Sequence, residues 1–587
     1  MRLLFRLFAA MLSGGALALC FAPFDQDWLV WGWLWVLFPV LWTTSPVKSL
    51  RKGFGLGFLS GFCFWVINLK WLGSVTWLGV LVFALYLALY FGVFGAFAAT
   101  CGNPWLKSDV TRGNSRVANR FWELGRSLGY AAVLAGLWCG LEWIRGWMAT
   151  GFGWNGLGVV FSQNLVLAQN AEFVGVIGLS FLPVFVSAVF VQSARRFAQQ
   201  ARSGGVKLIQ WDFAAALLVV MLAFFVGTHR LISIVEAPKV EARFLLVQQD
   251  IPQYANRVVW EPHEIVDGFV ELTEQGLTQV EDQARMAFDQ ESSENEVFKI
   301  QWPDFIVWPE ACLPFHFWVQ PDGQPQAGPG IENVIEYLGA LGDFSMLIGI
   351  NEASSDDTMS EATDRYNSLL LRTSENQRQT YKKNHLVLFG ETLPQFDFIY
   401  QLYEQTAGVP FSFGLTAGES FEPLSTSVGS QEIEIIPSIC FEDTVARLTR
   451  KFVRERPQVI VNVTNDGWFQ MSEGGLQHFR NSLFRCIELR RPMVRCANRG
   501  VTGIVSAAGS TVDPYTKSDR RLLDENGSHF HRGYLHASAY LLDQEGLSFY
   551  AKYGDWFAVS GLLVAFLWAW PYFKADKLRH RKTGESA

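Results

Sequence analysis

Residues 431–443 read QEIEIIPSICFED, and the central run 433–440 (IEIIPSIC) has the composition of a buried strand. Short runs of Val, Ile and Phe of this length are typical of strands covered on both faces. The run ends on Cys440, and two carboxylates, Glu442 and Asp443, follow closely. Sites in α/β folds are usually assembled where strands end, so Cys440 is a candidate nucleophile. A single cysteine in such a place is more often a small buried apolar residue, so the interpretation needs further residues.

Runs of the same kind recur through residues 239–550 and are separated by polar loops. Helical stretches at 263–288 and 474–490 lie between some of them, which predicts layered α/β architecture. The polar segments 289–299, 353–364 and 515–532 are predicted surface insertions. The other predicted strands are 240–248, 305–308, 346–350, 368–372, 459–463 and 503–507.

The remainder of the chain is strongly apolar, and half of all 587 residues are hydrophobic. Apolar runs of about 18 residues with few charges predict membrane helices. Eight candidates occur, which predicts a polytopic α-helical membrane region of about eight helices. They are 3–22, 28–45, 53–69, 77–100, 128–148, 171–192, 211–228 and 556–573. The predicted domains are a seven-helix membrane region at 1–228, an extracytoplasmic domain at 229–555, a membrane helix at 556–573 and a basic tail at 574–587.

Charge predicts the orientation of these helices. With a cytoplasmic N-terminus, the inside segments carry 19 basic residues and the short outside loops carry only Lys70 and Arg145. Basic residues are retained on the cytoplasmic side, so both chain ends are predicted there and 229–555 is predicted outside. That domain holds 27 basic and 46 acidic residues, which argues against nucleic acid as a partner.

Two further motifs follow predicted strands and give Cys440 chemical partners. Trp308-Pro309-Glu310 follows one strand, and residues 381–391 (YKKNHLVLFGE) follow another. A cysteine nucleophile needs its thiolate, and therefore a base or a nearby cation. Glu310 can take the thiol proton, and Lys383 can favour the thiolate and stabilise an oxyanion. Taken singly, each motif has a plainer interpretation, a turn carboxylate or a solvated Lys-Lys pair.

The order W-P-E, Y-x-K-x-x-L-V-x-F-G-E and strand-C-F-E, with separations of 73 and 57 residues, resembles the nitrilase superfamily. A domain of that kind between membrane helices resembles the apolipoprotein N-acyltransferase branch. The segments 251–253 (IPQ), 465–469 (NDGWF) and 485–500 are also similar to that branch, so the resemblance covers essentially the whole chain. It implies an α-β-β-α sandwich for the outer domain.

The resemblance also implies roles for single residues. Cys440 is the implied nucleophile, Glu310 the general base and acid, and Lys383 the oxyanion stabiliser. Lys383 is preferred to Lys382 because it lies eight residues before Glu391, as the motif requires. The implied supporting residues are Glu391, Glu442 and Phe441, and the implied substrate-channel residues are Trp260 and Trp468. For each tryptophan, simple core packing is an equally good interpretation.

Three residues depart from the family pattern. Leu388 stands where Pro is usual, Phe441 where many members have Tyr, and Arg499 in a turn that is usually similar to Asn-Thr-Gly. None of them removes a catalytic group. Phe441 excludes any role that needs a phenol hydroxyl at that position.

The implied reaction transfers a fatty acyl group from a phospholipid, through a thioester on Cys440, to the N-terminal amine of diacylglyceryl-cysteine apolipoproteins. This would be the final step of lipoprotein maturation, at the periplasmic side of a bacterial inner membrane, with phosphatidylethanolamine as a usual donor. No cofactor is implied, and no CxxC or His/Cys cluster suggests a metal. Cys486 and Cys496 are a possible disulfide pair, which sequence cannot decide.

Two other functions fit part of the sequence. The outer domain could be an amidase or hydrolase that transfers acyl groups to water, although the membrane region argues against this. The chain could instead be a transporter or sensor with an inactive outer domain, which would require polar residues along a membrane path. Glu142 and Arg145 are the main candidates, and an i, i+3 ion pair or lipid-head-group contact explains them more simply.

Overall fold

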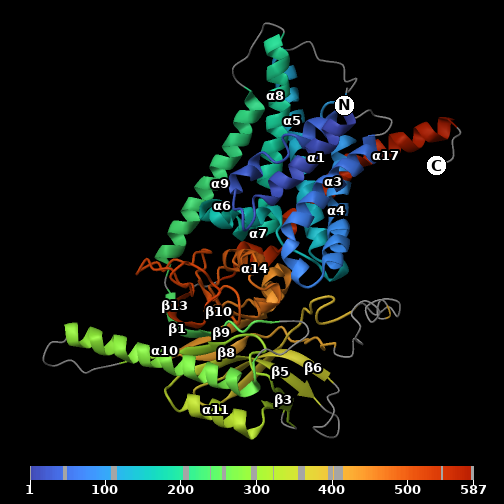
Figure 1. Ribbon diagram of the computed structural model, residues 1–587. Helices are drawn as coiled ribbons and strands as arrows, with labels where there is room; N and C mark the ends of the chain where they lie inside the picture. The colour runs from blue at the N-terminus through green and yellow to red at the C-terminus, as the bar shows by residue number, and fades with distance from the viewer. Residues whose placement is uncertain are drawn as a thin grey trace. The chain divides into compact units, whose positions relative to one another are not determined.

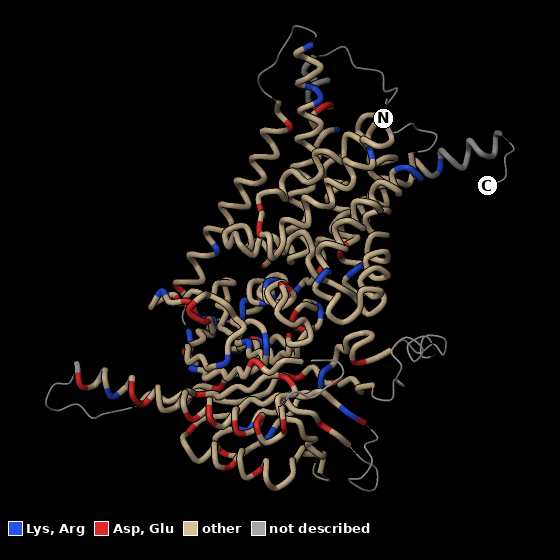
Figure 2. Tube along the Cα trace, in the orientation of Figure 1, with Lys and Arg blue, Asp and Glu red and all other residues tan. Residues whose placement is uncertain are grey.

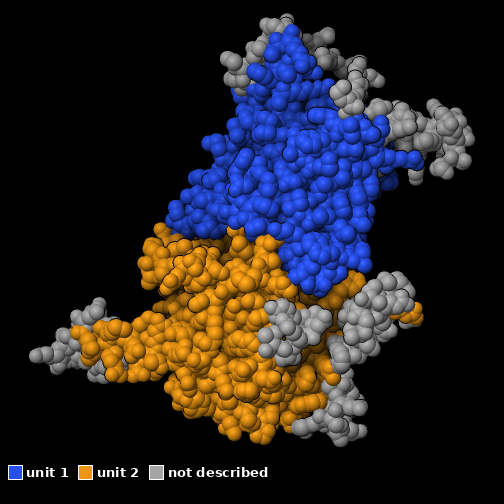
Figure 3. Space-filling view, viewed as in Figure 1, with its two compact units in different colours: residues 1–232, 552–587 blue, residues 233–551 orange. Residues whose placement is uncertain are grey.

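The computed structural model divides the chain into two compact units (Figure 3). One consists of residues 1–232 and 552–587, and the other of residues 233–551. The structure describes residues 2–43, 49–106, 116–202, 210–237, 239–253, 260–291, 300–320, 323–354, 364–393, 401, 414–543 and 546–583.

The first unit is helical (Figure 1). Among its described residues, four helices are long and apolar enough to cross a membrane, and the pair α7 and α8, bent by 59°, would make a fifth. The predicted count of eight is therefore not confirmed. Its main helices are α1 (Arg2–Ala18), α3 (Ser49–Asn68), α4 (Trp77–Ala99), α5 (Arg116–Arg145), α7 (Ala171–Leu179), α8 (Phe181–Arg202), α9 (Trp211–Glu236) and α17 (Trp556–Thr583).

Particular segments account for the difference. The predicted helix 28–45 is broken into the 3₁₀ turn η1 (Asp27–Trp31) and the short helix α2 (Leu37–Trp42). The apolar parts of α1 and α17 are shorter than a membrane span, at Leu3–Ala18 and Trp556–Tyr572. A run of apolar residues measures hydrophobicity but not continuity, so turns inside a buried segment escape it.

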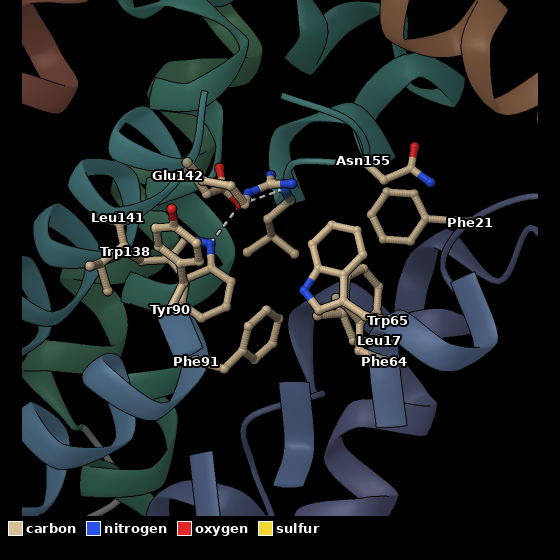
Figure 4. A pocket seen from close by; sticks show the side chains of 12 residues that line it. Leu17, Phe21, Phe64, Trp65, Tyr90, Phe91, Trp138, Leu141, Glu142 and Asn155 are labelled. Carbon is tan, nitrogen blue, oxygen red and sulfur yellow. Dashed lines mark hydrogen bonds between the residues drawn. The ribbon is translucent and has the colours of Figure 1, made fainter. Parts of the chain in front are cut away.

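Glu142 and Arg145 lie inside the first unit and line a small pocket (Figure 4). The Glu142 carboxylate accepts hydrogen bonds from the Trp138 indole at 2.8 Å, the Leu157 backbone N–H at 2.8 Å and the Ser180 hydroxyl at 2.6 Å. Arg145 donates to the Trp154 carbonyl at 2.7 Å. Both charges are therefore held by local hydrogen bonds that tie helices to loops, which explains them without a transport path.

The second unit contains two β-sheets. The larger has eight strands in the order β13-β1-β2-β5-β3-β4, with β6 paired to β5 and β7 to β6. Its strands are β1 (Lys239–Gln248), β2 (Phe305–Trp308), β3 (His316–Val319), β4 (Pro325–Gln326), β5 (Ser345–Ser354), β6 (Asp364–Arg372), β7 (Arg378–Lys382) and β13 (Gly533–Leu542). The smaller has the order β12-β11-β10-β9-β8, from β8 (Leu424–Val428), β9 (Gln431–Ile439), β10 (Gln458–Thr464), β11 (Met493–Ala497) and β12 (Gly503–Val505).

Strand β2 shows why the larger sheet is buried on both faces. Successive side chains of a strand point to opposite faces. Ile306 and Trp308 belong to a core shared with helices, whereas Phe305 stacks on Phe244 of β1 with ring centres 5.0 Å apart. The helices of that core are α10 (Pro262–Glu291) and α11 (Pro329–Gly339).

Helices cover both sides of the paired sheets. In Figure 1, α10 and α11 lie on one side of the sheets and α14 (Gly474–Ser482) on the other, which gives layers in the order α-β-β-α. Acidic residues recur along α10 (Figure 2), in line with the acidic composition of this part of the chain. Cys486, in α15 (Phe484–Leu489), and Cys496, in β11, are buried free thiols, so the possible disulfide between them does not form.

Candidate active site

Three strands of the second unit end where the candidate residues begin. Glu310 comes two residues after β2, Lys383 one residue after β7, and Cys440 directly after β9. Strands β2 and β7 belong to the larger sheet and β9 to the smaller one. The site is therefore assembled across the two sheets from segments that are distant in sequence.

Glu310 is 7% exposed, and donors hold both of its carboxylate oxygens. Oε1 accepts a hydrogen bond from Nδ2 of Asn367 at 2.7 Å, and Oε2 accepts one from the Asn465 backbone N–H at 2.7 Å. Burial raises the pKa of Glu310, which the Lys383 ammonium partly offsets. A buried carboxylate with a raised pKa is suited to accept and return protons.

Gly349 on β5 allows Glu310 to occupy this place. A side-chain carbon at position 349 would lie 2.3 Å from the Pro309 carbonyl oxygen and 2.6 Å from the Cα of Glu310. Both distances are far below van der Waals contact, so the segment after β2 can pass only over a residue without Cβ. The Gly349 carbonyl also accepts the Cys312 backbone N–H at 3.1 Å, which fixes the turn beyond Glu310.

Lys383 is 1% exposed and lies between two carboxylates. Its Nζ is 2.7 Å from Oε1 of Glu391 and 3.6 Å from Oε1 of Glu310. Burial alone would lower the pKa of Lys383, but Glu391 and Glu310 together raise it above its ordinary value. The side chain is thus held as a cation, as an oxyanion-stabilising role requires.

Lys382, the neighbouring lysine, points elsewhere. Its Nζ pairs with Oε1 of Glu352 at 3.0 Å and lies 3.9 Å from the centre of the Tyr366 ring, and its side chain is 33% exposed. Adjacent strand residues face opposite sides. The geometry therefore brings Lys383, and not Lys382, to Glu310.

Cys440 opens the 3₁₀ turn η6 (Cys440–Thr444) with a φ of +52°. A residue with a side chain held in this left-handed region costs about 1–3 kcal/mol, so its surroundings must impose the conformation. Nδ2 of Asn462 donates to the Cys440 carbonyl at 3.1 Å. Burial and the Glu310 carboxylate raise the pKa of the thiol, while Lys383 lowers it. At neutral pH Cys440 is therefore a thiol, and a base must remove its proton before it can act as a nucleophile.

Glu391 and Glu442 orient the lysine loop from two sides. Glu391 contacts Lys383 through Oε1 and accepts the Val387 backbone N–H through Oε2 at 2.8 Å. Glu442 is 1% exposed and accepts the backbone N–H groups of Asn384 at 2.8 Å and His385 at 2.9 Å. Glu442 also accepts the Ile439 N–H at 2.9 Å and the Tyr381 hydroxyl. One carboxylate thus joins the end of β9 to the loop that carries Lys383.

The three aromatic candidates lie in different surroundings. Trp260 packs against the helix-covered core of the larger sheet. Trp468, in the turn η8 (Asp466–Phe469), is 49% exposed. Phe441 stacks on the His385 ring, with centres 6.1 Å apart. Trp260 therefore has a packing role, and Phe441 contacts the loop that carries Lys383.

Several residues of the site were missed by sequence reasoning. Asn462 interrupts the apolar run 459–463 (VIVNV), which is a signal in the sequence, whereas Asn367 lies in a polar stretch before the run 368–372 and carries no such signal. Tyr381, whose hydroxyl bonds Glu442, was read only as part of a motif. His478 is 1% exposed and joins Asp443 to Asp466, which no spacing rule connects.

The departures from the family pattern are accommodated locally. Arg499 pairs with Asp250 at 2.8 Å, which balances its charge. Leu388 forms an isolated bridge with Thr392 in the loop between Lys383 and Glu391. Among the residues that the structure describes, no group of three or more His, Cys, Asp or Glu side chains could hold a metal ion.

Chemically, the arrangement offers a nucleophile, a base and a cation in one buried place. The electrostatic influence of Glu310 and Lys383 reaches the Cys440 thiol. Such a set performs acyl transfer through a covalent intermediate. The geometry does not by itself distinguish an amine from water as the final acceptor.

Comparisons with known families match both units. Residues 274–519 match the family of carbon-nitrogen hydrolases, and residues 13–189 match the apolipoprotein N-acyltransferase N-terminal domain. An apolipoprotein N-acyltransferase from Geobacter metallireducens is 30% identical over 589 residues, which cover 97% of this chain and 96% of that protein. One from Shewanella oneidensis is 27% identical over 86% of each chain.

Among solved structures, a CN-hydrolase superfamily protein from Xanthomonas campestris is 14% identical, covers 51% of this chain and 90% of its own, and gives a TM-score of 0.30.

Proposed function

This chain belongs to the apolipoprotein N-acyltransferase family and N-acylates lipoproteins, and on that premise we propose that Cys440 carries the acyl group as a thioester. The observation that supports this most is the position of the Lys383 ammonium, 3.6 Å from Glu310 and electrostatically coupled to the Cys440 thiol. Base, cation and nucleophile are then all present for two successive attacks on a carbonyl carbon.

In the first step, Glu310 takes the Cys440 proton and the thiolate attacks an ester carbonyl of a phospholipid. Lys383 and a backbone N–H stabilise the resulting oxyanion. The ester C–O bond then breaks, and Glu310 returns its proton to the departing lysophospholipid oxygen. Phosphatidylethanolamine is the donor that we propose.

In the second step, the α-amine of a diacylglyceryl-modified N-terminal cysteine attacks the thioester, and Glu310 accepts the amine proton. The C–S bond breaks, the amide is released, and Glu310 returns the proton to the Cys440 thiolate. Water must be kept from the thioester in between, because hydrolysis would waste the donor. We propose that Trp468 and Phe441 contact the acyl chain, while Glu391 and Glu442 keep Lys383 in position.

The location that we propose is a bacterial inner membrane, with the catalytic unit on the periplasmic side and both chain ends in the cytoplasm. The distribution of 19 basic residues inside against two outside supports it. Ser518 is exposed in the catalytic unit, so Ser518→Cys should react with a membrane-impermeant maleimide added to spheroplasts. If the variant is labelled more strongly than the unmodified protein only after the spheroplasts are lysed, the proposed orientation is contradicted.

The thioester itself can be tested on the purified intact protein with phospholipid labelled in its acyl chain. We expect a protein-bound label that hydroxylamine removes, and we expect Cys440→Ala to abolish it. Cys486→Ala is the matched control, since this buried thiol lies in α15 outside the site and should keep full labelling. Undiminished labelling of Cys440→Ala would refute the assignment.

A chase with a diacylglyceryl-cysteine peptide then identifies the acceptor. We expect the label to move to the peptide in an alkali-stable amide. Release as free fatty acid at the same rate with and without peptide would show a hydrolase instead.

A further inference from the structure

Four buried ionisable side chains form a cluster behind the Cys440 turn, and the reaction steps above do not use them. They are Asp443 of η6, Asp466 of η8, His478 of α14 and Arg495 of β11, and none is more than 2% exposed. Uncompensated buried charge strongly destabilises a fold. The cluster must therefore balance its charges internally.

The ring of His478 bridges the two carboxylates. Nδ1 lies 2.7 Å from Oδ1 of Asp466, and Nε2 lies 3.0 Å from Oδ1 of Asp443. An ionised carboxylate only accepts hydrogen bonds, so both ring nitrogens must carry a proton. An imidazolium at His478 therefore satisfies both carboxylates.

Arg495 completes the balance of charge. Its guanidinium pairs with Asp443 and, at 3.2 Å, with Asp466. Nη2 also lies 3.0 Å from Nδ1 of His478, an approach of like charges that the two carboxylates offset. With His478 protonated, two positive and two negative charges cancel, whereas a neutral His478 leaves one negative charge in excess.

The cluster is connected to the nucleophile through Asn462 on β10. Nη1 of Arg495 donates to Oδ1 of Asn462 at 2.8 Å, which fixes the orientation of that amide. Its Nδ2 then donates to the Cys440 carbonyl at 3.1 Å and to the Ser438 hydroxyl at 3.1 Å. Arg495 therefore helps to impose the left-handed conformation of Cys440.

A second connection reaches the base. Asp466 directly follows Asn465, whose backbone N–H donates to Oε2 of Glu310 at 2.7 Å. Any shift of Asp466 away from His478 would move that donor as well. The cluster thus contacts the supports of both the nucleophile and the base, while Lys383 is held separately by Glu391.

We propose that His478 is a positioning residue for this reaction: as an imidazolium held between Asp443 and Asp466, it keeps the Cys440 turn and the Glu310 support aligned. It acts through Asn462 and Asn465 and takes no part in proton transfer to the substrate. This inference rests on the proposed function, because alignment matters only if Cys440 and Glu310 react together.

The sign of the pH dependence follows from the partners of His478. Asp443 and Asp466 raise its pKa to about 9, against an opposing contribution from burial and from Arg495. A raised histidine pKa stabilises the fold fully below the unfolded value near 6.5, and that stability is lost as the pH rises through about 9. Alignment, and with it the rate of thioester formation, should decline in the same interval.

The test is the single-turnover rate of Cys440 acylation in the intact protein, measured with labelled phospholipid from pH 6 to 10. The final amount of thioester measures how much of the enzyme is folded and competent, and the rate constant measures how fast that fraction reacts. Unfolding lowers the amount, whereas misalignment lowers the rate constant. We expect the rate per competent site to fall at least tenfold across pH 9. A protein that forms no thioester at any pH would contradict the proposed function, whereas normal thioester formation with no alkaline decline would overturn only the role of His478.

Asp443→Asn and Asp466→Asn sharpen the test, because each removes one carboxylate that holds the proton on His478. The alkaline decline should move to lower pH by one unit or more in each variant that still forms thioester. His478→Gln should remove the decline and lower the acylation rate at pH 7 at least tenfold, with KM for phospholipid unchanged.

Glu332→Gln is the matched control, since Glu332 is a buried carboxylate paired with Arg378 in the same unit but remote from Cys440. It should lower thermal stability and leave the pH profile in place. A decline that stays at the same pH in both aspartate variants, or that moves equally in Glu332→Gln, would overturn the inference. If neither aspartate variant folds, the pH dependence of the acylation rate in the unmodified protein tests the inference, and the absence of an alkaline decline would overturn it.

Discussion

Asn367 donates from Nδ2 to Oε1 of Glu310 at 2.7 Å, and its backbone carbonyl accepts the Lys383 N–H at 2.8 Å. One residue of β6 therefore holds the base through its side chain and the lysine through its main chain. This hydrogen bond to the carboxylate lowers the pKa of Glu310 against the opposing influence of burial.

Replacing Asn367 by Ala should move the acid limb of thioester formation to higher pH. Without the amide donor the Glu310 carboxylate loses stabilisation, so its pKa rises and less of the ionised base is present near neutral pH. We expect a loss of about tenfold in kcat/KM at pH 6.5, consistent with one charged hydrogen bond. Asn351→Ala is the control, because Asn351 faces Asn367 across the β5–β6 pair but bonds the Leu313 carbonyl instead. An acid limb that does not move would contradict the prediction.

Lys383→Met should lower kcat by about a hundredfold or more, in line with the loss of an oxyanion-stabilising contact. Lys382→Met is the natural comparison, since it removes an adjacent lysine whose partners are Glu352 and Tyr366. We expect it to change kcat less than about threefold, because Lys382 pairs with Glu352 and not with Glu310, although the buried Glu352 loses its partner and thermal stability should fall. Equal losses of kcat in the two variants would show that the reaction does not depend on Lys383 more than on Lys382.

Gly349→Ala should displace the segment that carries Glu310. The new methyl group would meet the Pro309 carbonyl and the Glu310 Cα, and a displacement of about 1 Å at a catalytic group can cost on the order of a hundredfold in rate. Crowding a buried site should also lower the free energy of unfolding by about 1–3 kcal/mol. Gly330→Ala has open space around it and should change neither quantity, as kinetics and thermal unfolding can establish.

Glu442→Ala should release the lysine loop from the end of β9. It would leave three backbone N–H groups without their acceptor, those of Asn384, His385 and Ile439. Each one that stays buried should lower the free energy of unfolding by about 1–3 kcal/mol. Tyr381→Phe removes only one donor to the same carboxylate and should cost about 1 kcal/mol. Thermal unfolding and kcat of both variants would show whether the loop depends on the carboxylate or on the phenol.

The sequence was most informative where chemistry and strand ends coincide. Glu310 follows the predicted strand 305–308 and Cys440 ends the predicted strand 433–440, so both positions at strand ends could be predicted. Strand β7, which precedes Lys383, is polar (RQTYK) and was not among the predicted strands. The choice of Lys383 over Lys382 came from motif spacing, and the structure shows its physical basis in the alternation of faces. Their catalytic roles stay predictions until the variants are measured.

Other features depend on contacts between distant segments. The bond from Asn462 to Cys440 requires the pairing of β10 with β9, and the bond from Asn465 to Glu310 requires the packing of one sheet on the other. No local pattern encodes either contact. The membrane region differs from the prediction for another reason: residues 28–42 are apolar, yet the chain is divided there between η1 and α2, because composition does not record where a buried chain bends. Trp260 shows the remaining ambiguity, since an aromatic residue near a site can equally belong to a core.

The hairpin of β6 and β7 has one further consequence. Its register pairs Ser368 with Lys382, and a short turn around Asn376 sets that register. Removing one residue from the turn would slide β7 by a single position and move Lys382, its last residue, to the opposite face of the sheet. The length of this turn thus determines whether Lys382 or the following Lys383 faces Glu310, and any redesign of this enzyme would have to preserve it.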